Sequence, residues 1–313
     1  MTWKVLIADK LHPAGRERLA QSAQVDDHAG ISAEELQHII GDYHALIVRS
    51  RTKVTADLLA GARNLKVVGR AGVGVDNIDL EAAKAHGVTV VNAPQATSNA
   101  VAELTLGLML AMARRIPEAD ASMKRGEWLK KQLSGVELAG KTLGIFGMGR
   151  IGSLVAQKAA ALGMRVIGYD PLIPAEEIRR RGAEPRDTPQ ALYAEADFIS
   201  LHVPLTPDTR GMIGAEAFAQ MKRGVYLVCA ARGGVIDEEA LLQALESGQV
   251  AGAALDVFAT EPPGASPLVA HPRLIATPHI GAQTAEAQQR VAVDIAEEVL
   301  AALEGQPLRW RVV

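Results

Sequence analysis

The glycine-rich stretch Gly147-Met148-Gly149-Arg150-Ile151-Gly152 has the spacing G-x-G-x-x-G. It follows an apolar run, Thr142–Phe146, that predicts a strand, and it opens a helical pattern that stops at Gly163. In this context the glycines permit a tight turn, a close approach of the backbone to a pyrophosphate and close packing of the helix on the sheet. A turn that binds nothing is the alternative. We predict a dinucleotide site in which Gly147, Gly149, Arg150, Ile151 and Gly152 hold the pyrophosphate at the helix N-terminus.

Asp170 stands at the end of the next predicted strand, Arg165–Tyr169. A carboxylate at this position accepts hydrogen bonds from the ribose hydroxyls and repels a 2′-phosphate, which predicts NAD rather than NADP as the cofactor. A second glycine-rich stretch, Gly72-Val73-Gly74, has Asn77 in the place of the third glycine, so it predicts no second dinucleotide site. Its small residues either present backbone N–H groups to a carboxylate or form an ordinary tight turn.

Dehydrogenation with a nicotinamide cofactor needs a side chain that accepts the hydroxyl proton. Two histidines stand at the ends of predicted strands: His279 in "ATPHIGA" and His202 in "ISLHVPL". Ligands of open α/β sheets bind at the carboxyl ends of the strands, so position alone does not separate the two. The carboxylates Asp256 and Glu261 in "ALDVFATEPP" follow the preceding strand, and a carboxylate bonded to a histidine fixes its tautomer. This context favours His279 as the acid–base group.

Arg232 interrupts the stretch "LVCAARGGVID", where a buried strand ends and two glycines follow. A guanidinium at a strand end can grip a substrate carboxylate with its planar fork, whereas a solvated surface arginine is the alternative. The sequence contains no H-x-x-x-H, C-x-x-C or G-x-S-x-G pattern, and Cys229 lies inside the apolar strand. We therefore predict no metal site and no serine or cysteine nucleophile.

The elements that must position these residues alternate between apolar runs and helical patterns. The predicted strands are Lys4–Ala8, Ala45–Val48, Lys66–Val68, Thr89–Val91, Thr142–Phe146, Arg165–Tyr169, Phe198–Leu201, Val225–Val228, Gly252–Leu255 and Leu274–Ala276. Most are apolar throughout, which is typical of parallel strands covered on both faces. The pattern predicts an α/β fold of two doubly wound parallel-sheet domains, with a boundary near residue 98. Residues 284–305 predict a long helix that returns to the first domain.

The composition is that of a globular enzyme, with 313 residues, 48% hydrophobic and 22% charged. A net charge of −3 predicts no nucleic-acid partner. The N-terminus has no signal-peptide pattern, and the longest apolar stretch, residues 104–113, is too short to span a membrane. One cysteine excludes an internal disulfide and fits a reducing compartment. We expect a cytoplasmic protein.

With these motifs in view, the chain resembles the D-isomer-specific 2-hydroxyacid dehydrogenases along nearly its whole length. "VGRAGVGVDNIDLEAA", "GKTLGIFGMGRIG", "CAARGGVIDEEAL", "GAALDVFATEPP" and "TPHIGA" are similar to signatures of that family, in its order. The resemblance implies a Rossmann NAD-binding domain, residues 99–284, inserted in a smaller flavodoxin-like substrate domain made of residues 1–98 and 285–313. It also implies a catalytic set of Arg232, Glu261 and His279, cofactor contacts from Asp256 and Ala230, and a substrate-carboxylate site at Gly72 and Val73.

The resemblance further implies oxidation of a D-2-hydroxy acid, with 3-phosphoglycerate, a precursor in serine biosynthesis, as the first candidate. A glyoxylate or hydroxypyruvate reductase and an NAD-sensing, corepressor-like binding protein are the alternatives. Arg49 and Arg70 follow strands and, with Arg51, are placed to bind a substrate phosphate, whereas solvated surface charges are the alternative. The resemblance implies that the loop of Lys130 and Lys131 reaches over from a partner subunit. We expect a homodimer that forms through residues 99–140. The long apolar helical pattern at the start of this region is equally consistent with a helix buried in the core.

Three departures from the family pattern stand out. Cys229 occupies the place of an asparagine, which puts one hydrogen bond at the strand end in doubt. Val203 stands where some relatives have threonine, so a cofactor contact is missing there. The sequence ends at "LRWRVV", and we expect no feedback through the C-terminal regulatory domain of the long members.

Overall fold

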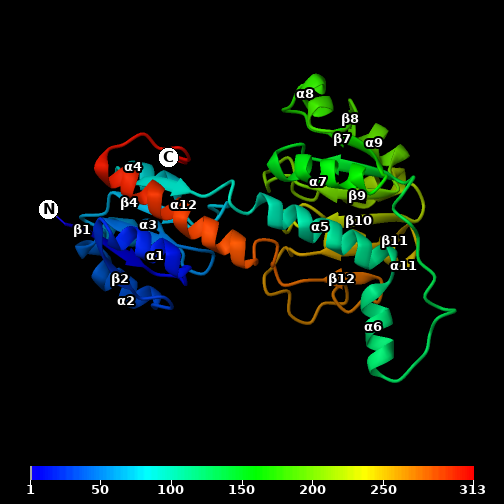
Figure 1. The fold of residues 1–313 in the computed structure, drawn as a ribbon, viewed down its shortest axis with the longest axis horizontal. Helices are drawn as coiled ribbons and strands as arrows, with labels where there is room; N and C mark the ends of the chain where they lie inside the picture. The colour runs from blue at the N-terminus through cyan, green and yellow to red at the C-terminus, as the bar shows by residue number, and fades with distance from the viewer. Residues whose placement is uncertain (1) are drawn as a thin grey trace. The chain divides into compact units, whose positions relative to one another are not determined.

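The computed structural model describes residues 2–313, which divide into two compact units (Figure 1). Unit 1 contains the residues up to Thr97 together with Ala282–Val313, and unit 2 is Ser98–Gly281. Each unit is built around one parallel sheet with helices on both faces. No helix within residues 2–313 combines the length and the apolar character needed to cross a membrane.

Unit 1 has a five-stranded sheet in the order β2-β1-β3-β4-β5, in which every neighbouring pair is parallel. Its strands are β1 (Trp3–Ile7), β2 (Ala23–Asp27), β3 (Ala45–Val48), β4 (Val67–Arg70) and β5 (Thr89–Asn92). Its helices are α1 (Pro13–Ala20), α2 (Ala33–Ile39), α3 (Ala56–Gly61), α4 (Leu80–Ala85) and α12 (Ala285–Glu304), with a short 3-10 turn, η1 (Ile40–Asp42). This is the flavodoxin-like order, and it reverses between β1 and β3.

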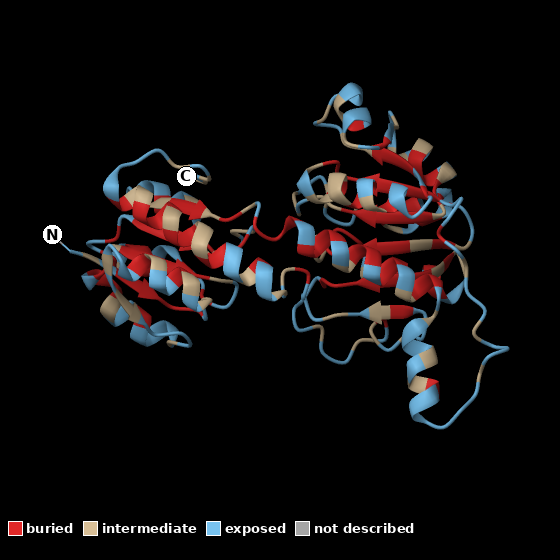
Figure 2. Cartoon of the chain, viewed as in Figure 1, coloured by how far each residue is buried: buried red, intermediate tan, exposed pale blue. Residues whose placement is uncertain are grey.

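The alternation of side chains along the strands divides the core of unit 1 into two halves. In β1, Leu6 packs with residues of α2, α3 and α4, while Val5 and Ile7 pack with residues of α1 and α12. Both faces of the strand are therefore apolar, which explains the continuous hydrophobic runs. Figure 2 shows the buried residues gathered in the strands and on the inner sides of the helices.

Unit 2 has a seven-stranded parallel sheet in the order β12-β11-β10-β9-β6-β7-β8. The strands are β6 (Thr142–Phe146), β7 (Arg165–Tyr169), β8 (Glu184–Pro185), β9 (Phe198–Leu201), β10 (Val225–Cys229), β11 (Val250–Leu255) and β12 (Leu274–Ala276). The helices are α5 (Ser98–Ala113), α6 (Ile116–Lys124), α7 (Arg150–Ala161), α8 (Ala175–Arg180), α9 (Pro189–Glu195), α10 (Ala215–Gln220) and α11 (Glu238–Glu246). The order reverses between β6 and β9, as in dinucleotide-binding sheets, so a ligand crevice belongs at their carboxyl ends.

All of the predicted strands are present, but the sequence prediction missed β2 and β8. β2, with the sequence AQVDD, has no buried residue, and β8 has only two residues. Both lie at sheet edges, where one side of the strand faces solvent and the apolar run disappears.

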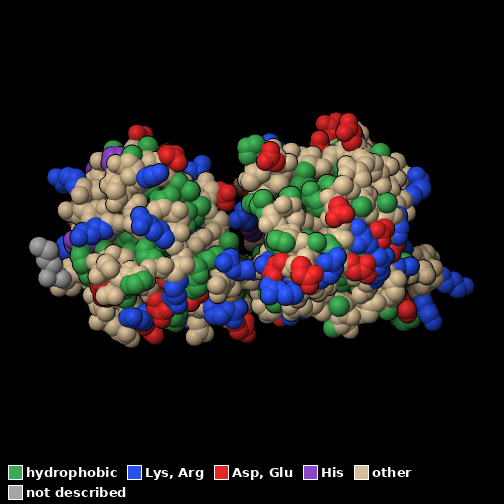
Figure 3. Space-filling view, turned by 90° about the horizontal axis from the view of Figure 1, so that it is seen from above, with side chains coloured by type: hydrophobic (Ala, Val, Ile, Leu, Met, Phe, Trp, Pro, Cys, Tyr) green, Lys and Arg blue, Asp and Glu red, His purple; other side chains and the backbone are tan. Residues whose placement is uncertain are grey.

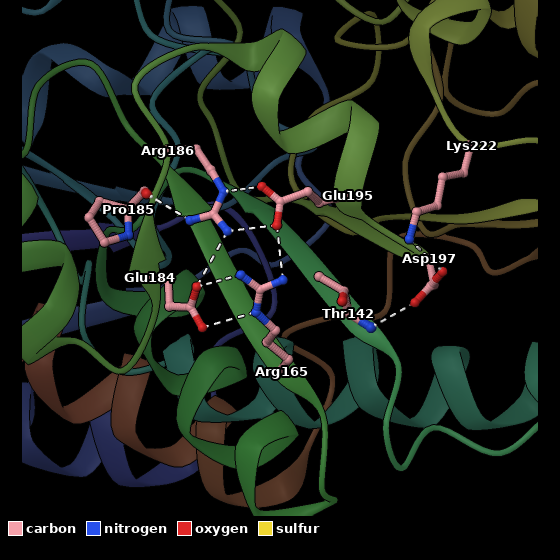
Figure 4. A network of polar contacts seen from close by, with 8 residues as sticks. All are labelled: Thr142, Arg165, Glu184, Pro185, Arg186, Glu195, Asp197 and Lys222. Carbon is pink, nitrogen blue, oxygen red and sulfur yellow. Dashed lines mark hydrogen bonds and ion pairs between the residues drawn. The ribbon is translucent and has the colours of Figure 1, made fainter.

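Charged side chains cover the sheet edge beside β8 (Figure 4). Arg165 donates from Nε to Glu184 at 3.0 Å and from Nη1 to Glu195 at 2.9 Å, and Arg186 Nε donates to Glu195 at 2.7 Å. These arginine hydrogen bonds lower the pKa of Glu195 to about 2. The network has a structural role, since charges at a sheet edge oppose pairing with another chain.

On the face drawn in Figure 3, basic and acidic side chains are interspersed.

Candidate functional site

The glycine turn of unit 2 joins β6 to α7 and has no room for side chains at its first and last glycines. Gly147 has φ +86°, and a Cβ there would lie 2.6 Å from the carbonyl oxygen of His202. A Cβ on Gly152 would overlap the carbonyl of Gly147. A Cβ on Gly149, by contrast, would have nothing within 4 Å. The outer glycines are therefore required by packing, while the middle one borders open space.

This open space fits a dinucleotide pyrophosphate. Gly149 is the N-cap of α7 and supplies no side-chain hydrogen bond to the helix, so the first-turn N–H groups of Arg150, Ile151 and Gly152 are left for an anion. Asp170 lies beside the turn: its Oδ2 accepts from Met148 N at 2.9 Å and its Oδ1 from Leu172 N at 3.0 Å. A carboxylate oxygen can accept more than one hydrogen bond, so Asp170 retains acceptor capacity for ribose hydroxyls.

His279 and Glu261 form a hydrogen-bonded pair. The His279 Nδ1 to Glu261 Oε2 distance is 2.8 Å, and both side chains are partly exposed. The other carboxylate oxygen, Oε1, accepts from Phe258 N at 3.1 Å, which fixes the orientation of the carboxylate. A proton on Nδ1 leaves Nε2 as the ring atom that can accept one. Within residues 2–313, Nε2 has no hydrogen-bond partner.

The carboxylate of Asp256 accepts hydrogen bonds from the turn that contains His279. Its carboxylate is 1% exposed and accepts from Thr277 Oγ1 at 2.6 Å, from Ile280 N at 2.8 Å and from Gly281 N at 2.8 Å. His279 itself has φ +52°, an uncommon conformation for a residue other than glycine. The three bonds around it hold the turn in that conformation. The contact of Asp256 with nicotinamide stays a prediction.

Arg232 follows β10, beyond the buried Ala230, and its Nη1 donates to Ala231 O at 2.7 Å. Gly233 follows Arg232 and has no room for a side chain, because a Cβ there would overlap the carbonyl of Phe258. Burial raises the pKa of the Cys229 thiol to about 11, and its Sγ lies 3.8 Å from Arg232 O. Cys229 therefore stays protonated and is part of the hydrophobic core.

His202 differs from His279 in its burial and in its hydrogen-bond partners. Its Nε2 lies 2.8 Å from Ser200 Oγ, and its Nδ1 is buried and has no hydrogen-bond partner among residues 2–313. Burial lowers the pKa of His202 to about 4. The imidazole is neutral at pH 7 and, among residues 2–313, has no carboxylate partner. The geometry favours His279, the histidine that the sequence context favoured.

In unit 1, the Gly72-Val73-Gly74 turn lies between β4 and α4. Gly72 has φ +147°, and a Cβ there would overlap the guanidinium of Arg70. Its N–H donates to Arg70 O at 2.8 Å, so the N–H groups left for a carboxylate are those of Val73 and Gly74. Sequence reasoning did not identify Asn92, whose Nδ2 donates to Val73 O at 2.7 Å.

Three arginines that follow strands β3 and β4 of unit 1 differ in their contacts. Arg49 and Arg70 stand at the ends of the neighbouring strands β3 and β4, where Val48 pairs with Arg70. Burial lowers the pKa of Arg49. Arg51, in contrast, is tied down: its Nε donates to Asp9 at 2.9 Å and its Nη2 to Ala8 O at 2.8 Å. Arg51 is thus part of the framework that holds the loop after β3.

Lys130 and Lys131 are exposed in the segment after α6 in unit 2. Within residues 2–313, no group of three or more His, Cys, Asp or Glu side chains is arranged to hold a metal ion.

Comparison with known proteins identifies a matching family model and related sequences. The family model for the NAD-binding domain of D-isomer specific 2-hydroxyacid dehydrogenases matches residues 106–281. D-3-phosphoglycerate dehydrogenase of Methanocaldococcus jannaschii is 52% identical over 303 residues, which cover 97% of this chain and 58% of the relative. The chain thus spans little more than half the length of the curated relatives it matches.

Two solved structures are similar over almost their whole length. A glyoxylate reductase from Paecilomyes thermophila has a TM-score of 0.91 and 31% identity, covering 99% of this chain and 98% of that one. D-lactate dehydrogenase from Aquifex aeolicus, complexed with NAD and lactic acid, has a TM-score of 0.83 and 30% identity, covering 96% of each chain.

Proposed function

Because the chain belongs to the D-isomer-specific 2-hydroxyacid dehydrogenase family, we propose that it interconverts a D-2-hydroxy acid and its 2-keto acid with NAD. The observation that carries this proposal is the His279–Glu261 pair, 2.8 Å apart in the same unit as the glycine turn. A histidine oriented by a carboxylate is suited to take a hydroxyl proton.

Each residue has a defined role in this proposal. The turn at 147–152 and Asp170 would hold NAD, which when bound supplies a hydride acceptor at its nicotinamide ring. His279 Nε2 takes the proton from the C2 hydroxyl, and Glu261 stabilises the resulting imidazolium charge. Arg232 grips the substrate through its guanidinium fork. The backbone N–H groups of Val73 and Gly74 bind the substrate carboxylate.

A single substitution tests the acid–base role. His279→Ala should lower kcat by roughly 10²–10⁴, the usual contribution of a positioned acid–base group. His86→Ala, a change of an exposed histidine in unit 1, is the control and should leave kcat unchanged. A kcat for His279→Ala within twofold of wild type would refute the assignment.

We propose 3-phosphoglycerate and 3-phosphohydroxypyruvate as the substrate pair. The proposal is supported by the identity to phosphoglycerate dehydrogenases and by the adjacent arginines Arg49 and Arg70, which suit a phosphate. Reduction of glyoxylate or hydroxypyruvate is the second candidate, favoured by the similarity to a glyoxylate reductase.

Turnover of 3-phosphohydroxypyruvate, hydroxypyruvate and glyoxylate with NADH, measured side by side, decides between the two. Arg49→Ala and Arg70→Ala should each raise KM for the phosphorylated acid at least tenfold, about 1.4 kcal/mol, and barely change KM for glyoxylate. Arg18→Ala, which alters a partly exposed arginine of α1, is the matched control. A wild-type preference for glyoxylate would exclude the phosphorylated substrate and leave the dehydrogenase proposal intact.

We also propose a homodimer formed through residues 99–140, in the cytoplasm. Four large apolar side chains are exposed within this region: Leu110 at 39%, Ile116 at 51%, Met123 at 55% and Trp128 at 74%. Exposed apolar side chains concentrated in one segment are typical of an association surface. Trp128→Glu should shift the protein to a monomer in analytical ultracentrifugation, and an unchanged dimer would refute this interface.

A further inference from the structure

Asn92, the last residue of β5, contacts the glycine turn that the proposed function assigns to the substrate carboxylate. Its side-chain Nδ2 donates to Val73 O at 2.7 Å. The next residue, Ala93, donates its backbone N–H to Gly72 O at 2.9 Å. Two consecutive carbonyls of the turn are therefore held from the end of β5.

This anchoring determines where the N–H groups of the turn point. In a planar trans peptide the C=O of one residue and the N–H of the next point in opposite directions. With the carbonyls of Gly72 and Val73 turned toward β5, the N–H groups of Val73 and Gly74 are turned away from it. Neither N–H has a hydrogen-bond partner within residues 2–313. Successive N–H groups on one side of a turn form a site for an anion.

The backbone of Asn92 is hydrogen-bonded to the C-terminal segment. Its backbone N–H donates to Trp310 O at 3.3 Å, and Val312 N donates to Val90 O at 2.8 Å, so this segment pairs antiparallel with β5. Arg309 N and Trp310 N each donate at 3.0 Å to Glu298, a carboxylate of α12 that is 1% exposed. The amide that holds Val73 thus sits on a fixed backbone, as preorganised sites require.

We infer that Asn92 is a positioning residue for substrate-carboxylate binding, acting through the Val73–Gly74 peptide. The inference rests on the proposed function of the turn. An amide suits the position because Val73 O is an acceptor and needs a donor. An aspartate would have no proton to donate at pH 7 and would add a negative charge beside the anion site.

Steady-state kinetics of Asn92→Ala and Asn92→Asp test the inference. Asn92→Ala should raise KM for the preferred 2-keto acid about fivefold, equivalent to about 1 kcal/mol, with kcat and KM for NADH within twofold of wild type. Asn92→Asp should raise KM further. Equal KM values for wild type and Asn92→Ala, or a loss confined to kcat, would overturn the inference.

Asn64→Ala is the matched control, because Asn64 Nδ2 also donates one bond, at 2.7 Å, to a backbone carbonyl of unit 1, that of Gly41. We expect a comparable loss of thermal stability from this control and no change in KM. If Asn64→Ala raised KM as much as Asn92→Ala, the effect would be one of general stability and the inference would be wrong.

Calorimetric titration with oxalate, an unreactive dicarboxylate, separates failure of this inference from failure of the proposed function. A wild type that turns over no 2-keto acid refutes the proposed function, and oxalate binding that weakens about fivefold in Asn92→Ala still supports the positioning role. Oxalate that fails to bind the wild type, or that binds Asn92→Ala equally well, overturns the role.

Discussion

Acidification should destabilise unit 2 through His202. Burial lowers the pKa of His202 from 6.5 to about 4. Between pH 6.5 and pH 4, the imidazole is therefore mostly protonated in the unfolded chain and mostly neutral in the folded protein. The stability associated with the neutral imidazole is present above pH 6.5 and is lost as the pH falls toward 4. The full shift corresponds to about 3 kcal/mol, of which about 2 kcal/mol is lost between pH 7 and pH 5.

Urea unfolding, followed by circular dichroism at pH 7, 6 and 5, measures this loss for wild type and for His202→Gln. The variant cannot protonate, so its free energy of unfolding should fall by about 2 kcal/mol less than that of wild type over the same range. Taking the difference between proteins removes the contribution of the other titrating groups.

Ser200→Ala is the matched control. It removes the hydroxyl that lies 2.8 Å from His202 Nε2 and keeps the imidazole in place. Because burial causes the shift, this variant should retain the pH dependence of wild type even if it is less stable at every pH. The reasoning would be refuted if wild type and His202→Gln lost the same stability on acidification.

Two further predictions concern the cofactor and the packing of the loops around Arg232. Asp170→Ala should weaken NAD binding and narrow the preference over NADP in a fluorescence titration, because both the ribose acceptor and its charge are removed; a wild type that uses both cofactors equally would contradict this role. Gly233→Ala should destabilise the protein by about 1–3 kcal/mol in urea unfolding, because the new Cβ meets the carbonyl of Phe258. Gly107→Ala, where a Cβ meets nothing within 4 Å in the middle of α5, is the control and should be neutral or stabilising.

Local constraints made the glycine turn and the inner strands predictable from the sequence. Gly147 is required by a positive φ and Gly152 by a close backbone contact, so their spacing between a predicted strand and a predicted helix indicated the geometry. The inner strands are apolar on both faces because helices cover both faces. The long helix α12 was equally readable, with Thr284 as its N-cap and Gly305 at φ +68° as its end. The edge strands β2 and β8 were missed because β2 has no fully buried residue and β8 has only two residues.

The sequence by itself determined which residue types stand at the strand ends, since a strand and its following residue are contiguous in the chain. Only the tertiary structure decided which of them act together. His279 meets a carboxylate 18 residues earlier, while His202, at an equivalent strand end, is enclosed and has a lowered pKa. The contact of Asn92 with Val73 was equally hidden, because it depends on β4 lying beside β5. Partner choice and burial depend on how separate strands are brought side by side, and the order of residues along the chain does not specify this locally.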